Sequence, residues 1–432
     1  MRPSPIARTT RTTLGAIAAG ALLLAGASTA SAGVRTPAAD APARASAAAL
    51  AAYTASPADV RMRSALTSRA TTARFGTVFS GTVLDAASNT TVWGRNSTSY
   101  RMPASTNKLV TATNALTVFG PGKRWTTRVR SGSSADRVIL VGAGDPSLKS
   151  TSLEAMAATT AVRLLARKVT AAKVYVDDDV FPTPTLAYGW KASYVPDSIA
   201  PVRGLVRDQR NTPDTSADAG RYFRDRLKAH GVTGAVYSGR ANAVTGAAII
   251  ASSTGSTLAS MVASMLLHSD NEVAEALHKL VGRQLGQGAS WTGARTAQAQ
   301  QLAAQKLTSG PLYDGSGLSR ADRITTLQLT QILDRGIDAG TQATLWPLKA
   351  GLPSAGRTGT LASRFSTAAS RCAVGRVFAK TGTLNDVVSL AGWATGADGR
   401  VKVFAFIVNG RTSSTTLKQN VDMLAATVTG CY

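Results

Sequence analysis

The chain has few of the side chains that most often bind metal ions, since its 432 residues include only two cysteines and three histidines. The histidines, His230, His268 and His278, stand in no metal-ligand spacing with cysteines or acidic residues. This scarcity argues against a metal-dependent enzyme, and we expect no metal site. The glycines of Gly142-Ala-Gly144 lack the third glycine of a dinucleotide fingerprint, and no other cofactor is expected.

Acidic residues are also scarce. Only 24 aspartates and glutamates oppose 48 lysines and arginines, which gives a formal net charge of +24. A basic chain of this kind suggests nucleic acid or another anionic surface as its partner. The charge is scattered, however, and no dense run of basic residues is interleaved with aromatic ones. Which anionic partner is expected therefore depends on the cellular compartment in which the protein works.

The first 32 residues have the features of a secretion signal. Three arginines and no acid accompany the apolar run Leu14–Ala27, which is too short to span a bilayer, and Ala30-Ser31-Ala32 is a small-residue cleavage site. No arginine pair is present, which favours the Sec route over the twin-arginine route. We expect a secreted, cell-wall-associated protein whose mature chain has no transmembrane or lipid anchor. Such a protein rarely meets nucleic acid, so an anionic cell-wall polymer is the candidate partner.

Export also bears on Cys372 and Cys431. In an oxidising compartment two cysteines most simply pair, and we expect a disulfide between them. Two buried free thiols are the alternative.

Hydrophobic periodicity predicts an α+β fold in several segments. After the signal, residues 33–71 form a linker or N-terminal segment, and residues 130–250 alternate strands with helices as an inserted α/β unit. The flanking parts, 72–129 and 251–432, form one domain that includes an all-helical region. Its expected antiparallel sheet is crossed by a helix over 416–428 and comprises strands at 77–85, 90–95, 377–380, 387–393 and 401–409.

The segment around Ser105 carries the first chemical signal. Pro103 precedes a run with helical spacing, which places Ser105 near a helix N-terminus and Lys108 one turn further on the same face. A lysine that is desolvated, or close to another cation, can be neutral and accept the proton of a serine hydroxyl. A capping serine beside a solvated lysine is the alternative interpretation.

A second signal is Ser269-Asp-Asn271, at a turn between two predicted helices. A serine there can pass a proton to a leaving amine, and an asparagine can hold an amide carbonyl of a substrate. Taken alone, this tripeptide is more often a capping turn.

The third signal is Lys380-Thr381-Gly382-Thr383, at the end of a predicted strand. Gly382 would let a substrate backbone approach and pair with the strand edge, while the lysine and the two hydroxyls suit a carboxylate. The N–H groups of Thr383 and Ser105 could form an oxyanion hole. Lys380 could also lower the pKa of Lys108 as a neighbouring cation. Alone, the motif is more often an ordinary strand end.

The three signals together, in this order, resemble the penicillin-recognising serine enzymes. More closely, the chain from about residue 72 onward is similar to the class C low-molecular-mass penicillin-binding proteins, the D-alanyl-D-alanine carboxypeptidase/endopeptidase family. The motifs that carry the resemblance are Pro103-Ala-Ser-Thr-Asn-Lys108, Gly144-Asp-Pro146, Ser269-Asp-Asn271, Asp314-Gly-Ser-Gly-Leu-Ser-Arg320 and Ala379-Lys-Thr-Gly-Thr383.

The resemblance implies a transpeptidase/β-lactamase-like core that acts on peptidoglycan stem peptides and is inhibited covalently by β-lactams. In it Ser105 forms the acyl-enzyme, Lys108 is the base, and Ser269 and Asn271 transfer protons and position the substrate.

The remaining family motifs imply substrate contacts. Lys380, Thr381 and Thr383 would bind the substrate carboxylate, with Gly382 between them. Arg320, with an acidic residue of the insert matched best by Asp177 or Asp178, would hold the charged stem-peptide side chain. From its residue type alone, Arg320 could equally be a surface ion-pair partner.

Two other functions stay open at this point. A serine β-lactamase shares the motifs, but class A enzymes add a glutamate that activates the deacylating water. The chain has only Glu154, Glu272 and Glu275, none of them in the loops beyond the second motif, which argues against efficient β-lactam hydrolysis. A non-catalytic wall-binding or β-lactam-sensing module is disfavoured by the intact Ser105 and Lys108.

Overall fold

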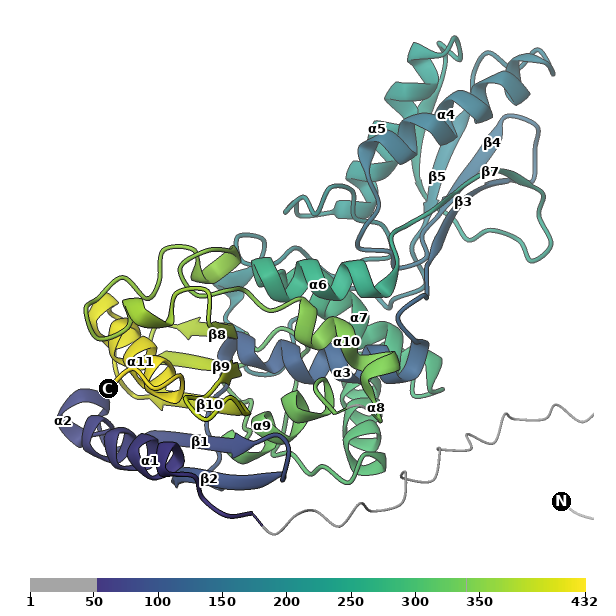
Figure 1. The fold of residues 1–432 in the computed structure, drawn as a ribbon. Helices are drawn as coiled ribbons and strands as arrows, with labels where there is room; N and C mark the ends of the chain where they lie inside the picture. The colour runs from purple at the N-terminus through teal and green to yellow at the C-terminus, as the bar shows by residue number, and fades with distance from the viewer. Residues whose placement is uncertain (1–52, 339) are drawn as a thin grey trace, which may run out of the picture. The chain divides into compact units, whose positions relative to one another are not determined.

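A computed structural model describes residues 53–338 and 340–432 (Figure 1). The predicted signal peptide, and the part of the 33–71 segment before residue 53, lie outside the described residues. Within the described residues, no helix is long and apolar enough to cross a membrane.

One five-stranded antiparallel sheet forms the centre of the domain, with strand order β2-β1-β10-β9-β8. The strands are β1 (Phe79–Asp85), β2 (Thr90–Arg95), β8 (Val377–Leu384), β9 (Val387–Thr395) and β10 (Val401–Asn409). The expected antiparallel sheet is therefore confirmed. One detail differs, because β8 continues to Leu384 and Lys380-Thr-Gly-Thr383 lies inside the strand, where Gly382 is opposite Ser389 of β9.

Alternation along β10 explains how the sheet holds two hydrophobic cores. Phe404, Phe406 and Val408 pack toward one core, whereas Val403, Ala405 and Ile407 belong to the other. Successive side chains of a strand point to opposite faces, so a central strand buried on both sides needs apolar residues at every position.

Different helices cover the two faces. Helices α1 (Pro57–Arg69) and α11 (Thr415–Val428) supply residues to the core with Phe404. A group of helices supplies residues to the other core: α3 (Lys108–Phe119), α6 (Leu258–His268), α7 (Asn271–Gln284), α8 (Trp291–Ala304), α9 (Thr326–Arg335) and α10 (Gln342–Ala350). The short elements are α2 (Thr72–Phe75), η1 (Ala104–Asn107), η2 (Ala192–Tyr194), η3 (Gly359–Leu361) and η4 (Arg371–Ala373).

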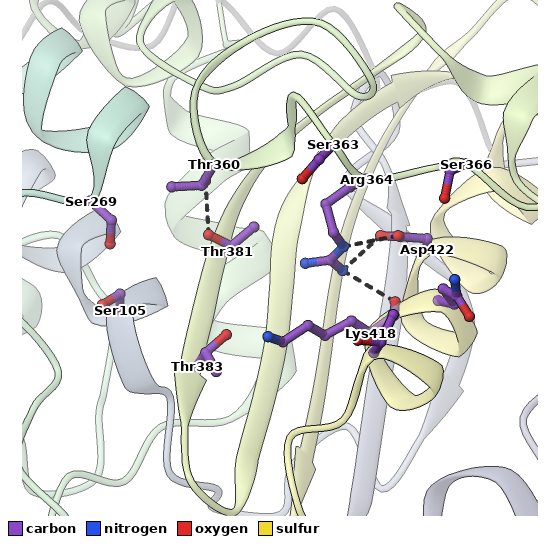
Figure 2. Close-up of a pocket in the computed structure, with 12 residues that line it drawn as sticks. Ser105, Ser269, Thr360, Ser363, Arg364, Ser366, Thr381, Thr383, Lys418 and Asp422 are labelled. Carbon is purple, nitrogen blue, oxygen red and sulfur yellow. Dashed lines mark hydrogen bonds and ion pairs between the residues drawn. The ribbon is translucent and has the colours of Figure 1, made fainter.

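β8 is an edge strand, and its neighbours position the site. The segments that carry Ser105 and Ser269 lie beside β8 (Figure 2). Near the C-terminus, Cys372 and Cys431 form a disulfide, with Cα atoms 6.3 Å apart. This bridge joins the loop that leads into β8 to the residues that follow α11.

The insert forms a second five-stranded sheet, with order β6-β5-β4-β3-β7. Its elements are β3 (Thr126–Ser131), β4 (Arg137–Val141), α4 (Ser150–Leu165), β5 (Lys173–Asp177), α5 (Thr215–Ala229), β6 (Val236–Arg240) and β7 (Ile249–Thr254). β4, β5 and β6 run parallel, while β3 pairs antiparallel with both β4 and β7. Because β3 and β7 pair with each other, the sheet spans 126–254 and is wider than the predicted 130–250.

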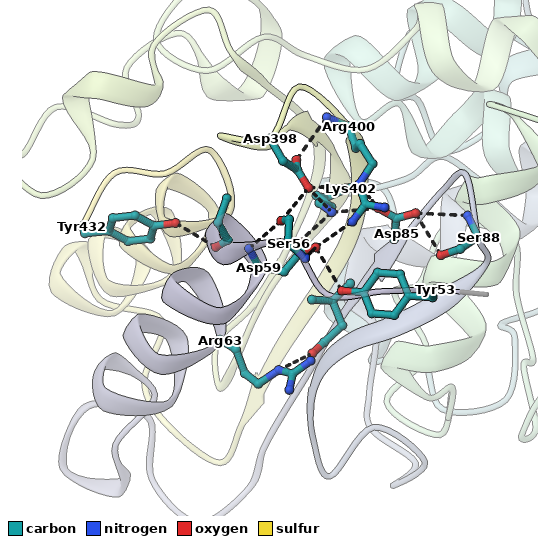
Figure 3. A network of polar contacts seen from close by, with 12 residues as sticks. Tyr53, Ser56, Asp59, Arg63, Asp85, Ser88, Asp398, Arg400, Lys402 and Tyr432 are labelled. Carbon is teal, nitrogen blue, oxygen red and sulfur yellow. Dashed lines mark hydrogen bonds and ion pairs between the residues drawn. The ribbon is translucent and has the colours of Figure 1, made fainter. Parts of the chain in front are cut away.

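A buried network of charges ties the start of the described chain to the sheet (Figure 3). Lys402 of β10 is 1% exposed, and its ammonium lies 2.7 Å from Asp59, 2.7 Å from Asp85 and 3.0 Å from Asp398. Asp59 belongs to α1, whose N-cap Ser56 forms a capping box with it. Residues 57–69, which lie within the predicted N-terminal segment 33–71, form a helix anchored to β1 and β10.

We expect Lys402→Met to destabilise the protein by about 3 kcal/mol or more, because it leaves buried carboxylates without their cation. Burial alone would raise the pKa of Asp59, but hydrogen bonds from Lys402 and Ser56 hold it well below its ordinary value. A carboxylate with a depressed pKa stabilises the fold above its unfolded pKa and loses that contribution as the pH falls.

Urea unfolding at pH 7 and at pH 3 measures this effect, with Lys228→Met on the exposed face of α5 as the control. The gap between Lys402→Met and wild type should narrow at the lower pH. Equal stability of the two proteins at pH 7 would contradict the assignment.

Candidate active site

Ser105 lies in the 3-10 turn η1, directly before α3. The preceding residue, Ala104, has a left-handed backbone with φ 50°, which costs free energy for any residue other than glycine. Close packing accompanies this strain, since a Cβ on Gly317 would lie 1.9 Å from the carbonyl oxygen of Ala104. The strained turn that carries Ser105 therefore packs directly against the loop that contains Gly317, and this contact helps to hold it in place.

Lys108, the first residue of α3, is fully buried below Ser105. Its ammonium donates to Ser105 Oγ at 3.0 Å, to Asn271 Oδ1 at 2.7 Å and to the carbonyl oxygen of Ser316 at 2.8 Å. A buried ammonium needs such acceptors, because it has lost its hydration. The structure thus brings together two of the three motifs, with a third acceptor from the loop at 314–320.

Burial lowers the pKa of Lys108 to about 8, although the carboxylates of Glu275, Asp314 and Asp270 favour its charged form. A lysine with a pKa of about 8 is neutral in an appreciable fraction of molecules near neutral pH. Lys108 can therefore accept the Ser105 proton across a contact that already exists.

A second serine–lysine pair faces the first. Lys380 of β8 is fully buried and donates to Ser269 Oγ at 2.8 Å and to the carbonyl oxygen of Thr381 at 2.7 Å. Burial lowers the pKa of Lys380 well below its ordinary value, and the charge of Lys108 lowers it further. The predicted effect in the other direction is not found, because burial alone lowers the pKa of Lys108 and Lys380 does not contribute to that shift.

The turn between α6 and α7 aims the second motif at Lys108 and Lys380. Ser269 is left-handed, with φ 63°, and ends α6, while Asp270 caps α7 by accepting the N–H of Val273 at 3.0 Å. Asn271 accepts from Lys108 and donates to the carbonyl oxygen of Ser198 at 2.8 Å. The capping interpretation therefore holds for Asp270, and its two neighbours are free to face the site.

The buried loop at 314–320, which begins with Asp314, supports the site, and the sequence alone did not reveal this role. Asp314 accepts the N–H groups of Gly317 and Ser319, at 2.8 and 2.7 Å, and the indole N–H of Trp190 at 2.7 Å. The side-chain amide of Asn107 donates to the backbone carbonyl oxygen of Asp314 at 2.8 Å, and this bond joins the loop to the Ser105 turn.

Glu275 holds the same loop from α7. It is fully buried and accepts the N–H groups of Gly315 and Ser316 at 2.9 and 2.7 Å. These bonds place the carbonyl oxygen of Ser316 against Lys108. The motif at 314–320 was visible in the sequence, but its carbonyl contact could only come from the fold.

Gly382 has a packing role in addition to the predicted one. A Cβ there would lie 2.2 Å from Ser389 Oγ, 2.7 Å from the Pro103 carbonyl oxygen and 3.0 Å from the Ser105 nitrogen. Ser389 in turn donates to the Pro103 carbonyl oxygen at 2.6 Å. Glycine at this position therefore lets the Ser105 turn lie directly against β8.

A cavity of about 480 Å³ opens over this junction (Figure 2). Its lining includes Ser105, Ser269, Thr381 and Thr383, so it brings together hydroxyl groups from all three motifs. Thr381 donates to Thr360 at 2.9 Å.

The predicted stem-peptide residues make contacts elsewhere. Arg320 donates to both carboxylate oxygens of Asp386 at 2.8 Å, which is the ion-pair arrangement that the sequence left open. Asp178 pairs with Arg203 and Arg240 at the end of β5, and Asp177 accepts the Ala243 N–H at 2.8 Å. Neither aspartate is among the described residues that line the cavity.

Fold and site together define a penicillin-recognising serine enzyme. The model of the D-Ala-D-Ala carboxypeptidase 3 (S13) family matches residues 62–211 and 198–429. The chain therefore belongs to this family, and the predicted enzyme class, a serine-type D-Ala-D-Ala carboxypeptidase, is confirmed.

Individual relatives agree with the family. The chain is 32% identical over 375 residues to the carboxypeptidase DacB of Mycolicibacterium smegmatis, covering 82% of this chain and 81% of the relative. It is 34% identical over 355 residues to a carboxypeptidase of Mycobacterium tuberculosis, covering 76% of each. The crystal structure of penicillin binding protein 4 from Haemophilus influenzae shares the fold, with a TM-score of 0.72, 19% identity and coverage of 84% and 97%. The predicted α+β class is confirmed.

Gly317→Ala should lower the rate of D-alanine release about tenfold or more, because the new Cβ would push the Ser105 turn away from Lys108. Gly399→Ala is the matched control: its φ of 77° is nearly the same as the 81° of Gly317, but a Cβ there meets nothing within 4 Å. The control should lose only about 1 kcal/mol of stability. Equal activity of the two variants would show that the contact with Ala104 does not matter.

The kcat/KM for D-alanine release should rise with pH and level off above about 9. Lys108 accepts a proton only when neutral, and burial lowers its pKa to about 8, so the active fraction grows as pH rises through that value. Lys279 also has a pKa lowered to about 8 by burial, and Lys279→Met is therefore the control for the assignment. A profile that is flat between pH 6 and 10, or one that moves in the Lys279 variant, would refute the role of Lys108.

Proposed function

We propose that the protein is an exported D-alanyl-D-alanine carboxypeptidase and endopeptidase that acts on peptidoglycan stem peptides through an acyl-enzyme on Ser105. The observation that carries this proposal is the 3.0 Å contact between the buried Lys108 ammonium and Ser105 Oγ. Sequence features of the first 32 residues support export, and the family supports a substrate in the cell wall.

Acylation begins when neutral Lys108 takes the Ser105 proton and Oγ attacks the carbonyl carbon between the two D-alanines. Residues 353–355 already pair with the start of β8, so the substrate would extend along the part of its edge at residues 381–383, as an added strand would. Backbone N–H groups of Ser105 and Thr383 receive the developing oxyanion. The lowered pKa of Lys108 makes the first proton transfer accessible near neutral pH.

The amide C–N bond then breaks, and the leaving amine needs a proton. Ser269 is suited to deliver it, because its hydroxyl lines the cavity and accepts a hydrogen bond from Lys380. Asn271 holds the substrate amide next to Lys108. Ser269 regains a proton from Lys380, and Lys380 regains one from Lys108, which is thereby neutral again. Water then attacks the ester and gives a proton to Lys108, which passes it to the departing Ser105 oxygen, so that the shortened peptide leaves and Ser105 is restored.

The substrate carboxylate next to the scissile amide binds the hydroxyls of Thr381 and Thr383. Its negative charge would favour the protonated form of Lys380, and repulsion would then favour neutral Lys108. Substrate binding thereby helps to set the protonation states that acylation requires.

Arg320 stays our candidate for the charged side chain of the stem peptide. Its side chain is 32% exposed, and its guanidinium is held in a two-point contact by Asp386. A substrate carboxylate would have to exchange with Asp386, or an ammonium group of the stem could bind beside it. Asp177 and Asp178 are weaker candidates, since both already accept hydrogen bonds within the insert.

β-Lactams should acylate the same serine and clear slowly. Glu272 accepts the N–H of Ala200 at 2.6 Å, and Glu275 holds the N–H groups of Gly315 and Ser316. Both acids are thus engaged in structural bonds, and neither is among the described residues that line the cavity. This arrangement favours a penicillin-binding peptidase over an efficient β-lactamase.

Ser105→Ala should abolish both penicillin labelling and D-alanine release, while its free energy of unfolding should stay within about 1 kcal/mol of wild type. Intact mass and peptide mapping after incubation with a fluorescent penicillin locate the adduct. Ser133→Ala, in an exposed turn of the insert, is the matched control and should label normally. Residual peptidase activity in Ser105→Ala would overturn the mechanism, and an adduct that clears in seconds would favour a β-lactamase.

A further inference from the structure

The cavity over Ser105 extends well beyond the three motifs. Past Thr381 it reaches the loop before β8 and the first two turns of α11, where its lining residues are Thr360, Ser363, Arg364, Ser366, Thr415, Lys418, Gln419 and Asp422. A volume of about 480 Å³ lies within the range of pockets that enclose drug-sized ligands. The site therefore has room for a leaving group larger than one alanine.

Two of the charges in this extension neutralise each other. Arg364 donates to both oxygens of Asp422 at 2.9 and 2.7 Å, and Asp422 also accepts the Phe365 N–H at 3.2 Å. The Asp422 side chain is 1% exposed and that of Arg364 is 14% exposed. Arg364 also donates to the carbonyl oxygen of Lys418 at 3.1 Å, which fixes the first turn of α11.

Lys418 is left as the uncompensated charge of the extension. Its side chain is half-buried and reaches across the cavity toward β8, where Thr383 lies (Figure 2). Its ammonium forms no hydrogen bond or ion pair within residues 53–338 and 340–432. The N-terminal end of α11 adds a favourable dipole for an anion at the same place.

The position of Ser269 shows which part of a substrate would meet Lys418. In the proposed function Ser269 protonates the leaving amine, so the leaving group must lie on its side of the cleaved bond. Ser269, Thr381 and Lys418 line one cavity. Arg320 and Asp386, our candidates for the acyl side, are not among its described lining residues.

We propose that Lys418 is a specificity-determining residue that binds a second carboxylate on the leaving group. The carboxylate next to the scissile amide already has Thr381 and Thr383, whereas Lys418 is free for another. The enzyme would therefore favour leaving amino acids or peptides that carry an additional carboxylate. This inference rests on the proposed function, because it takes the direction of the substrate from it.

Paired substrates test this directly. We would use peptides with one common acyl part ending in D-alanyl and with D-glutamate or D-glutamine as the leaving group, which differ in charge but hardly in shape. Wild type should show a kcat/KM ratio of about five in favour of D-glutamate, the effect of a partly exposed charge pair. The preference should shrink at high salt.

Substitutions at Lys418 should change that ratio. Lys418→Met should bring it to about one, and Lys418→Glu should invert it, whereas Lys228→Met on the exposed face of α5 should leave it as in wild type. A wild-type ratio of one, or a ratio that persists in Lys418→Met, would overturn the inference. Penicillin acylation of Ser105, measured in parallel, separates this outcome from a failure of the proposed function, in which wild type would not be acylated.

Discussion

A buried ammonium group is the constraint on which the site depends. Lys108 has no access to water, and its three acceptors come from the turn before α3, the start of α7 and the loop at 314–320. Burial without acceptors would be prohibitive, so these distant segments must meet around one side chain. The same burial that imposes this cost lowers the pKa of Lys108, which would suit it to the proposed role as the base.

Lys380 repeats this arrangement beside Ser269. Each lysine is buried and donates to one serine hydroxyl, and the two serines, but not the lysines, are among the described residues that line the cavity. One pair would activate the nucleophile and the other would protonate the leaving amine. A negatively charged substrate would decide which lysine carries the proton. Lys418 also lines the cavity, and we propose that its positive charge binds a second carboxylate on the leaving group.

Much of the site could be predicted because its chemistry lies in short motifs. Ser105 and Lys108 are one turn apart, so local spacing already placed them together. The support from Glu275 and Ser316 could not be predicted, since it consists of backbone contacts between segments that only the fold brings together. In the insert, β6 is a short strand with no fully buried residue, so its hydrophobic pattern is too weak to predict the strand from the sequence.

The most direct test of the central claim is to titrate Lys108 itself. NMR of the protein with isotope-labelled lysine side chains would follow each Cε–Nζ group from pH 6 to 11, with Lys108→Arg to assign the signal. The account predicts a midpoint near 8 for Lys108, well below the ordinary lysine value of about 10.4. A Lys108 midpoint at that ordinary value would contradict its role as the base.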